Sequence, residues 1–104
     1  MINIYDIFIA HVSWGEDGKR RPVLILEQGA YAVTVFSITT RYEGKSEAVR
    51  NNYFRINDWR QAGLDRESYV DTNGTVTLQQ SSVERLLGTL TEGDAQGLIE
   101  FLAR

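Results

Sequence analysis

The stretch GKRRPVLIL, Gly18 to Leu26, sets three consecutive cations against a proline and an unbroken aliphatic run. The residues from Val23 to Leu26 are apolar on both faces of a pleated strand, which predicts a strand covered on both sides. Pro22 suits the start of such a strand, where a missing N–H is tolerated. The cations at the mouth of this strand need an explanation, because the whole chain has a net charge of −3.

The composition is that of an ordinary globular protein. The chain has 104 residues, 42% of them hydrophobic and 24% charged, which predicts a single domain over residues 1–104. With no cysteine and one histidine, we expect no metal site and no cofactor. No apolar run is long enough to span a membrane, and the first residues lack the cationic segment of a signal peptide. We therefore expect a cytoplasmic protein without a membrane partner.

Charge is distributed unevenly along the chain. Nine of the eleven cations but five of the fourteen acids lie between Gly18 and Arg66, so the middle is basic and the remainder is acidic. A basic middle suits an anionic ligand that is bound locally. Uneven surface charge without a ligand explains the same counts equally well.

The rest of the chain is a series of short strands with a helix at the end. Strands are predicted over residues 4–12, 22–26, 32–38 and 53–56, and the Asn73-Gly74 dipeptide predicts a hairpin between strands 68–71 and 75–78. Residues 41–51 have no periodicity and are predicted to form a loop.

Three helical segments are predicted. Asn57 begins a short helix that Gly63 ends, residues 83–87 form one turn, and Thr91 caps a terminal helix. The terminal helix has one apolar face, formed by Ala95, Leu98, Ile99 and Leu102. The predicted fold is mainly β with small helices (α+β), a curled antiparallel sheet or barrel followed by a C-terminal helix.

Three segments, in their order and spacing, resemble the PemK/MazF-like toxins of type II toxin–antitoxin systems. They are Tyr5-Asp6-Ile7 in the first strand, RRPVLIL in the second strand, and Ser37-Ile38-Thr39-Thr40 at the end of the third. The resemblance implies an SH3-like sheet and a homodimer. It also implies an mRNA interferase, a metal-independent endoribonuclease that cleaves single-stranded RNA through its 2′-hydroxyl. A cognate antitoxin, whose disordered tail lies in the RNA groove, would neutralise it.

The resemblance assigns the catalytic roles to Arg21 and Thr39. The key arginine of the family directly precedes the proline of the second strand, and its key threonine ends the third strand. Two places differ from the family pattern. Tyr5 stands where the family has glycine, and Asp71 to Thr75 replace a Glu-Gln-hydrophobic-Arg segment.

The chemistry suits these two side chains. A guanidinium matches two phosphate oxygens, and a hydroxyl both donates and accepts a hydrogen bond. In an antiparallel pair the start of one strand lies beside the end of the next, so Arg21 and Thr39 are expected to reach one phosphate. RNA contacts are predicted for further residues, with Lys19 placed in the loop before the second strand. They are Trp14, Lys19, Arg20, Thr40, Arg41 and Lys45.

Each assignment has a structural alternative. Without the resemblance, a salt bridge with Glu16 or Asp17 is the better explanation of Arg21, and the preference of β-branched residues for strands is the better explanation of Thr39. Trp14 suits a core or a dimer interface as well as a base. His11 is a candidate general base by residue type, but the family motif does not use it, and a position at the rim or in the packing explains it as well. At the level of the whole protein, the alternative is a non-catalytic RNA-binding or protein-binding module on the same scaffold.

Overall fold

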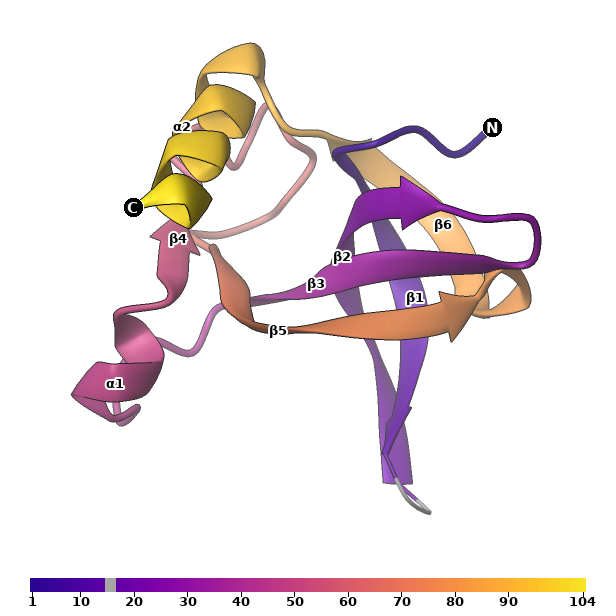
Figure 1. Cartoon of the computed structure of the whole chain (residues 1–104), viewed down its shortest axis with the longest axis horizontal. Coiled ribbons are helices and arrows are strands. Elements are labelled where there is room, and N and C mark those ends of the chain that lie inside the picture. The colour runs from indigo at the N-terminus through magenta and orange to yellow at the C-terminus, as the bar shows by residue number, and fades with distance from the viewer. Residues whose placement is uncertain (15–16) are drawn as a thin grey trace.

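A computed structural model of the chain describes residues 1–14 and 17–104, with the Trp14 side chain outside the described part. The described strands form one six-stranded sheet in the order β4–β5–β3–β2–β1–β6, with antiparallel pairing throughout. The elements are β1 (Asp6–Trp14), β2 (Asp17–Gln28), β3 (Ala32–Thr39), α1 (Glu47–Arg50), β4 (Tyr53–Arg55), β5 (Tyr69–Gln79), the 3₁₀ turn η1 (Gln80–Ser82), β6 (Val83–Thr89) and α2 (Glu92–Ala103). Figure 1 shows that the β1–β2 hairpin extends beyond the rest of the sheet, away from α2.

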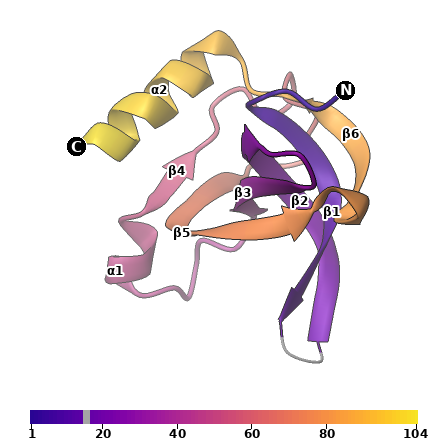
Figure 2. The ribbon, with the colours of Figure 1, turned by 45° about the vertical axis from the view of Figure 1, so that its right-hand side comes forward.

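The sheet is covered on both faces, as the aliphatic run in β2 predicts. Val23, Leu24 and Ile25 are fully buried. One core cluster contains Leu24 with Leu98 of α2, and the other contains Val23 and Ile25. The sheet is curled, as the wrapping strands in Figure 2 show, and the two faces of β2 pack into separate core clusters. The predicted fold class is thereby confirmed.

The predicted hairpin at Asn73-Gly74 is wrong. Residues 69–79 form one strand, β5. The Asn73-Gly74 dipeptide lies where the pairing of β5 with β3 is irregular, and the chain does not reverse there. Val35 pairs with Val76 while Ser37 pairs with Asp71, so the residues between bulge out of the ladder. The Asn73 side chain donates to Asp71 Oδ1 at 2.8 Å and to the Val49 carbonyl at 3.1 Å, which holds this bulge against α1.

Two predicted helical segments and one predicted loop also differ from the structure. Residues 83–87 belong to β6, because pairing with β1 satisfies their backbone. Residues 57–63 form successive hydrogen-bonded turns in place of the predicted helix, and their first N–H groups bond to a distant carboxylate. Asp94 of α2 accepts from the backbone of Asn57 at 3.1 Å and of Asp58 at 2.8 Å. The predicted loop 41–51 contains α1, which Ser46 caps.

Tyr5 adopts a backbone conformation that glycine prefers. Its φ is +71°, in the left-handed region, and the residue stands where the resembled family has glycine. A non-glycine residue there costs about 1 kcal/mol. The Tyr5 amide donates to Ile25 O at 2.7 Å, its carbonyl accepts from Leu90 N at 3.1 Å, and its ring packs on the core. These contacts hold the backbone just before β1. The next residue, Asp6, accepts a hydrogen bond from Thr89 Oγ1 at 2.7 Å.

The backbone of Gly63 lies directly against the backbone of Leu87. Gly63 has φ +89°, and a Cβ there would lie 2.0 Å from Leu87 O. We expect Gly63→Ala to lower the free energy of unfolding by more than about 1 kcal/mol, measured by urea denaturation. Gly74→Ala is the control, because a Cβ at Gly74 meets nothing within 4 Å. Equal stability of the two variants would contradict this account of the contact.

Candidate active site

Strand register brings Arg21 and Thr39 to the same place. The β2–β3 pairing ends at Val23 and Ser37, and Arg21 and Thr39 follow two residues beyond them at the same end of the ladder. Since side chains alternate along a strand, Arg21 shares a face with Val23, and Thr39 with Ser37. Both side chains line a groove of 410 Å³, and Arg21 Nε is buried there.

Every described residue that the sequence predicts for RNA contact also lines this groove. They are Lys19, Arg20, Thr40, Arg41 and Lys45. Lys19 is within β2, not in the loop before it as predicted, because β1 and β2 pair as far as Trp14 and Asp17. The side chain of the remaining predicted residue, Trp14, lies outside the described residues, as does Glu16, one of the alternative partners of Arg21.

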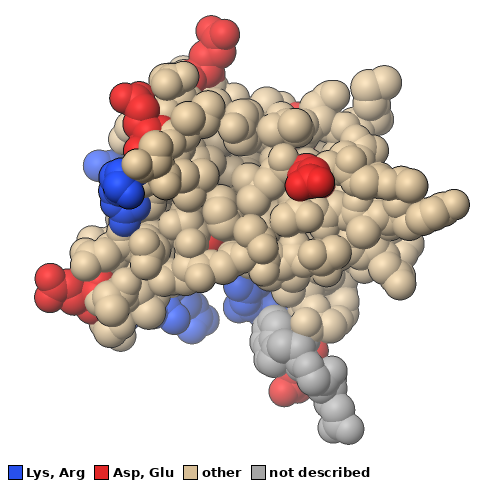
Figure 3. All heavy atoms as spheres, in the orientation of Figure 1, with Lys and Arg blue, Asp and Glu red and all other residues tan. Residues whose placement is uncertain are grey.

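The cations of the groove are close enough to disfavour one another's charge. The pKa of Lys19 is lowered from its ordinary value, mainly by Arg21, then by desolvation, and then by Arg41 and Lys45. The β2 strand and the loop after β3 therefore contribute to one positive site. Figure 3 shows basic side chains gathered at the lower edge of this view of the molecule. A bound anion would relieve this repulsion.

A tyrosine holds the loop that carries Arg41 and Lys45. The ring of Tyr42 stacks on Tyr69 of β5 at 4.8 Å between centroids, and the Arg50 guanidinium lies 5.3 Å from the centre of the Tyr42 ring. Thr39 Oγ1 accepts a hydrogen bond from Arg41 N at 3.0 Å. That bond fixes the direction of the Thr39 side chain and leaves its hydroxyl hydrogen available to a ligand.

Alternation along β2 separates Arg20 from Arg21. The Arg20 guanidinium pairs with Glu84 of β6 at 2.8 Å, so its charge is partly compensated on the other side of the strand. His11 pairs with Arg20 in the β1–β2 register, and its Nδ1 lies 3.2 Å from the Ser13 hydroxyl. His11 is not among the residues that line the groove.

The sequence prediction missed the wall of the groove that β4 and β5 provide. Tyr53 and Asp71 pair across these strands, and both line the groove together with Asp65 and Ser68. Burial raises the pKa of Tyr53, Asp71 raises it further, and Arg21 opposes them, which places all three side chains in one electrostatic neighbourhood. Of these residues the sequence marked only Asp71, because it begins the segment that differs from the family pattern.

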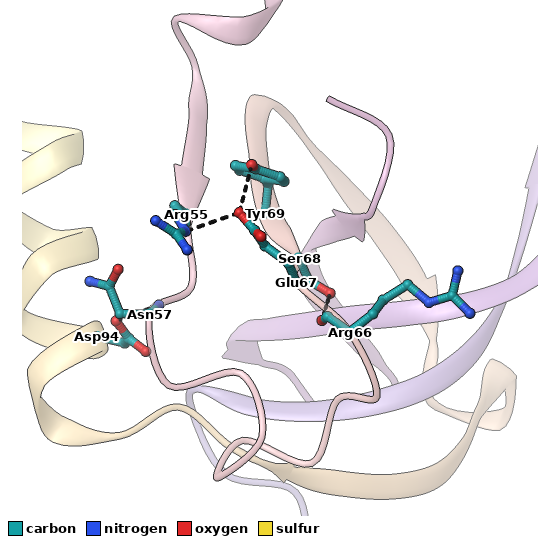
Figure 4. A network of polar contacts seen from close by, with 7 residues as sticks. All are labelled: Arg55, Asn57, Arg66, Glu67, Ser68, Tyr69 and Asp94. Carbon is teal, nitrogen blue, oxygen red and sulfur yellow. Dashed lines mark hydrogen bonds and ion pairs between the residues drawn. The ribbon is translucent and has the colours of Figure 1, made fainter. Parts of the chain in front are cut away.

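A second pocket adjoins the groove. It has a volume of 590 Å³ and shares Thr40, Arg41 and Lys45 with the groove. Tyr42, Glu43, Glu67 and Tyr69 also line it. Figure 4 shows the Glu67 carboxylate between Arg55 and the Tyr69 hydroxyl, while Arg66 points away from them.

The described part of the chain offers neither a cluster of metal-ligating side chains nor a membrane-spanning helix. Within residues 1–14 and 17–104, no group of three or more His, Cys, Asp or Glu side chains is placed to hold a metal ion. None of the described helices is long and apolar enough to cross a bilayer.

Comparison with known proteins identifies the family. The sequence profile described as PemK-like, MazF-like toxin of type II toxin-antitoxin system matches residues 4–104. Among solved structures, Mycobacterium tuberculosis toxin MazF-mt6 superimposes with a TM-score of 0.71 and 28% identity, covering 94% of this chain and 92% of that one. Another Mtb toxin gives a TM-score of 0.68 and 26% identity, covering 94% and 96%. Comparison with curated sequences finds no significant match.

The chain belongs to the PemK/MazF family of toxins of type II toxin–antitoxin systems, which are endoribonucleases. The resemblance seen in the sequence is thereby confirmed.

Repulsion between Arg21 and Lys19 can be measured without an assay of RNA cleavage. In Arg21→Ala the pKa of Lys19 should rise towards its ordinary value, because Arg21 is the largest cause of its depression. The chain has only two lysines, so NMR titration of isotope-labelled lysine side chains resolves Lys19 easily. Arg20→Ala should leave this pKa unchanged. An unchanged pKa in Arg21→Ala would show that the two side chains do not share a site.

Proposed function

We propose that the protein is an mRNA interferase that cleaves single-stranded RNA without a metal ion, with Arg21 and Thr39 at the scissile phosphate. The observation that carries the proposal is the β2–β3 register, which directs both side chains into one basic groove. A fixed guanidinium beside a fixed hydroxyl is a suitable binding site for a phosphodiester.

The reaction consists of two bond changes. The 2′-oxygen of the substrate forms a bond to phosphorus while the bond to the 5′-oxygen breaks. The 2′-hydroxyl loses a proton and the leaving oxygen gains one, so the products are a 2′,3′-cyclic phosphate and a 5′-hydroxyl. The step consumes neither water nor a cofactor.

Arg21 stabilises the charge that develops on the phosphorane oxygens. Its Nε is buried and Pro22 follows it directly, so its direction is set before RNA binds. Charge placed in this way contributes roughly 3 kcal/mol, or about a hundredfold in rate. Thr39 donates its hydroxyl hydrogen to a phosphate oxygen or orients the 2′-hydroxyl, because Arg41 N already occupies one side of its oxygen.

The other basic residues bind the RNA backbone. Lys19, Arg41 and Lys45 line the groove and contact neighbouring phosphates in a salt-dependent way. Thr40 adds a hydroxyl at the shared edge of the groove and the adjoining pocket, and Trp14 stacks on a base. Arg20 contributes least, since Glu84 already balances its charge.

The proposal extends to partners. As in the resembled family, the protein acts in the cytoplasm as a homodimer of single-domain subunits. A cognate antitoxin neutralises it by laying a disordered segment in the groove, where the cations favour an acidic partner. A monomer mass in light scattering at micromolar concentration would refute the homodimer.

The reaction is tested by incubating purified protein with a long RNA in excess EDTA. Cleavage should persist, and the fragments should carry 2′,3′-cyclic phosphate and 5′-hydroxyl ends, identified by mass spectrometry. Loss of cleavage on chelation, or 5′-phosphate ends, would contradict the mechanism. Binding of RNA without any cleavage would support the alternative of a non-catalytic RNA-binding module.

A further inference from the structure

We propose that the pocket beside the groove binds one nucleobase of the RNA, and that Glu67 selects bases with an exocyclic amino group over uracil. This inference rests on the proposed function, because it needs RNA in the groove. The pocket shares Thr40, Arg41 and Lys45 with the groove, so a strand whose phosphates follow these cations continues directly into it.

The pocket has the size and surface of a base site. Its 590 Å³ lies within the roughly 300–1,000 Å³ that small-molecule sites occupy. The rings of Tyr42 and Tyr69 line it and stack on each other, with 4.8 Å between their centroids and 24° between their planes, while Arg50 lies over Tyr42. Tyr69 is therefore the ring proposed to pack against a base, as aromatic rings do in single-stranded RNA.

Glu67 supplies an acceptor in a fixed position. Its Oε1 forms an ion pair with Arg55 Nε at 3.1 Å and accepts a hydrogen bond from the Tyr69 hydroxyl at 3.2 Å, and the two partners come from adjacent strands, β4 and β5 (Figure 4). The Glu67 side chain is 51% exposed, so a ligand can reach it. Among the described residues, Oε2 has no hydrogen-bond donor, which leaves that oxygen for the ligand.

The chemistry of a carboxylate determines which base fits. An ionised carboxylate only accepts hydrogen bonds, so it pairs with the amino group of adenine, cytosine or guanine. Uracil offers a carboxylate only its N3–H, which lies between two carbonyl oxygens that repel the carboxylate, so uracil pairs less well.

The test measures binding without cleavage. Fluorescence anisotropy compares 2′-O-methyl RNA hexamers of adenine, cytosine and uracil, which cannot react because the nucleophile is blocked. The wild-type protein should bind the adenine or the cytosine hexamer about tenfold more tightly than uracil. Glu67→Gln should abolish the preference, because an amide presents either a donor or an acceptor, while still accepting from Arg55 and Tyr69.

Glu100→Gln is the matched control, since it makes the same change of charge on α2 and Glu100 lines neither the pocket nor the groove. It should keep the wild-type preference. Equal binding of all hexamers by the wild type, or an unchanged preference in Glu67→Gln, would overturn the base pocket while leaving the proposed function intact. Failure to bind any hexamer would overturn both, and thermal unfolding of the variants verifies that each is folded.

Discussion

Burial of β2 on both faces is the constraint on which the rest of the structure depends. Val23, Leu24 and Ile25 have no exposed surface, so this strand lies inside the sheet with β1 on one side and β3 on the other. Slipping by one residue would reverse the two faces, moving Val23 into the core of Leu24 and carrying Arg21 away from the groove. Apolar packing therefore sets the register, and the register sets the position of the guanidinium.

The groove is electrostatically strained before any ligand binds. Arg21, Arg41 and Lys45 lie close enough to Lys19 to lower its pKa, so the cations of the groove disfavour one another's charge. Pro22 restricts the backbone next to Arg21, and the Tyr42–Tyr69 stack holds the loop of Arg41 and Lys45. Arg20, which also borders the groove, pairs with Glu84 of β6. The repulsion around Lys19 favours an anion in the groove, where RNA is proposed to bind.

The sequence predicted those parts of the fold that local patterns determine. The buried β2, the Thr91-capped α2 and the convergence of strand ends follow from periodicity, capping and antiparallel geometry. The predicted helix at 83–87 and hairpin at Asn73-Gly74 failed because pairing with β1 and β3 outweighed short-range preferences. Tyr53, Asp71 and Glu67 were missed as site residues because only the fold brings β4 and β5 beside β2 and the loop after β3.

The central claim is that Arg21 and Thr39 act on the same phosphate, and a double-mutant cycle tests it most directly. Single-turnover cleavage rates are measured for the wild type, Arg21→Ala, Thr39→Val and the double variant, with thermal unfolding to show that each is folded. If both groups stabilise one transition state, the double variant should be little slower than Arg21→Ala alone. If instead the two losses multiply, the residues act independently, and the shared site would be contradicted.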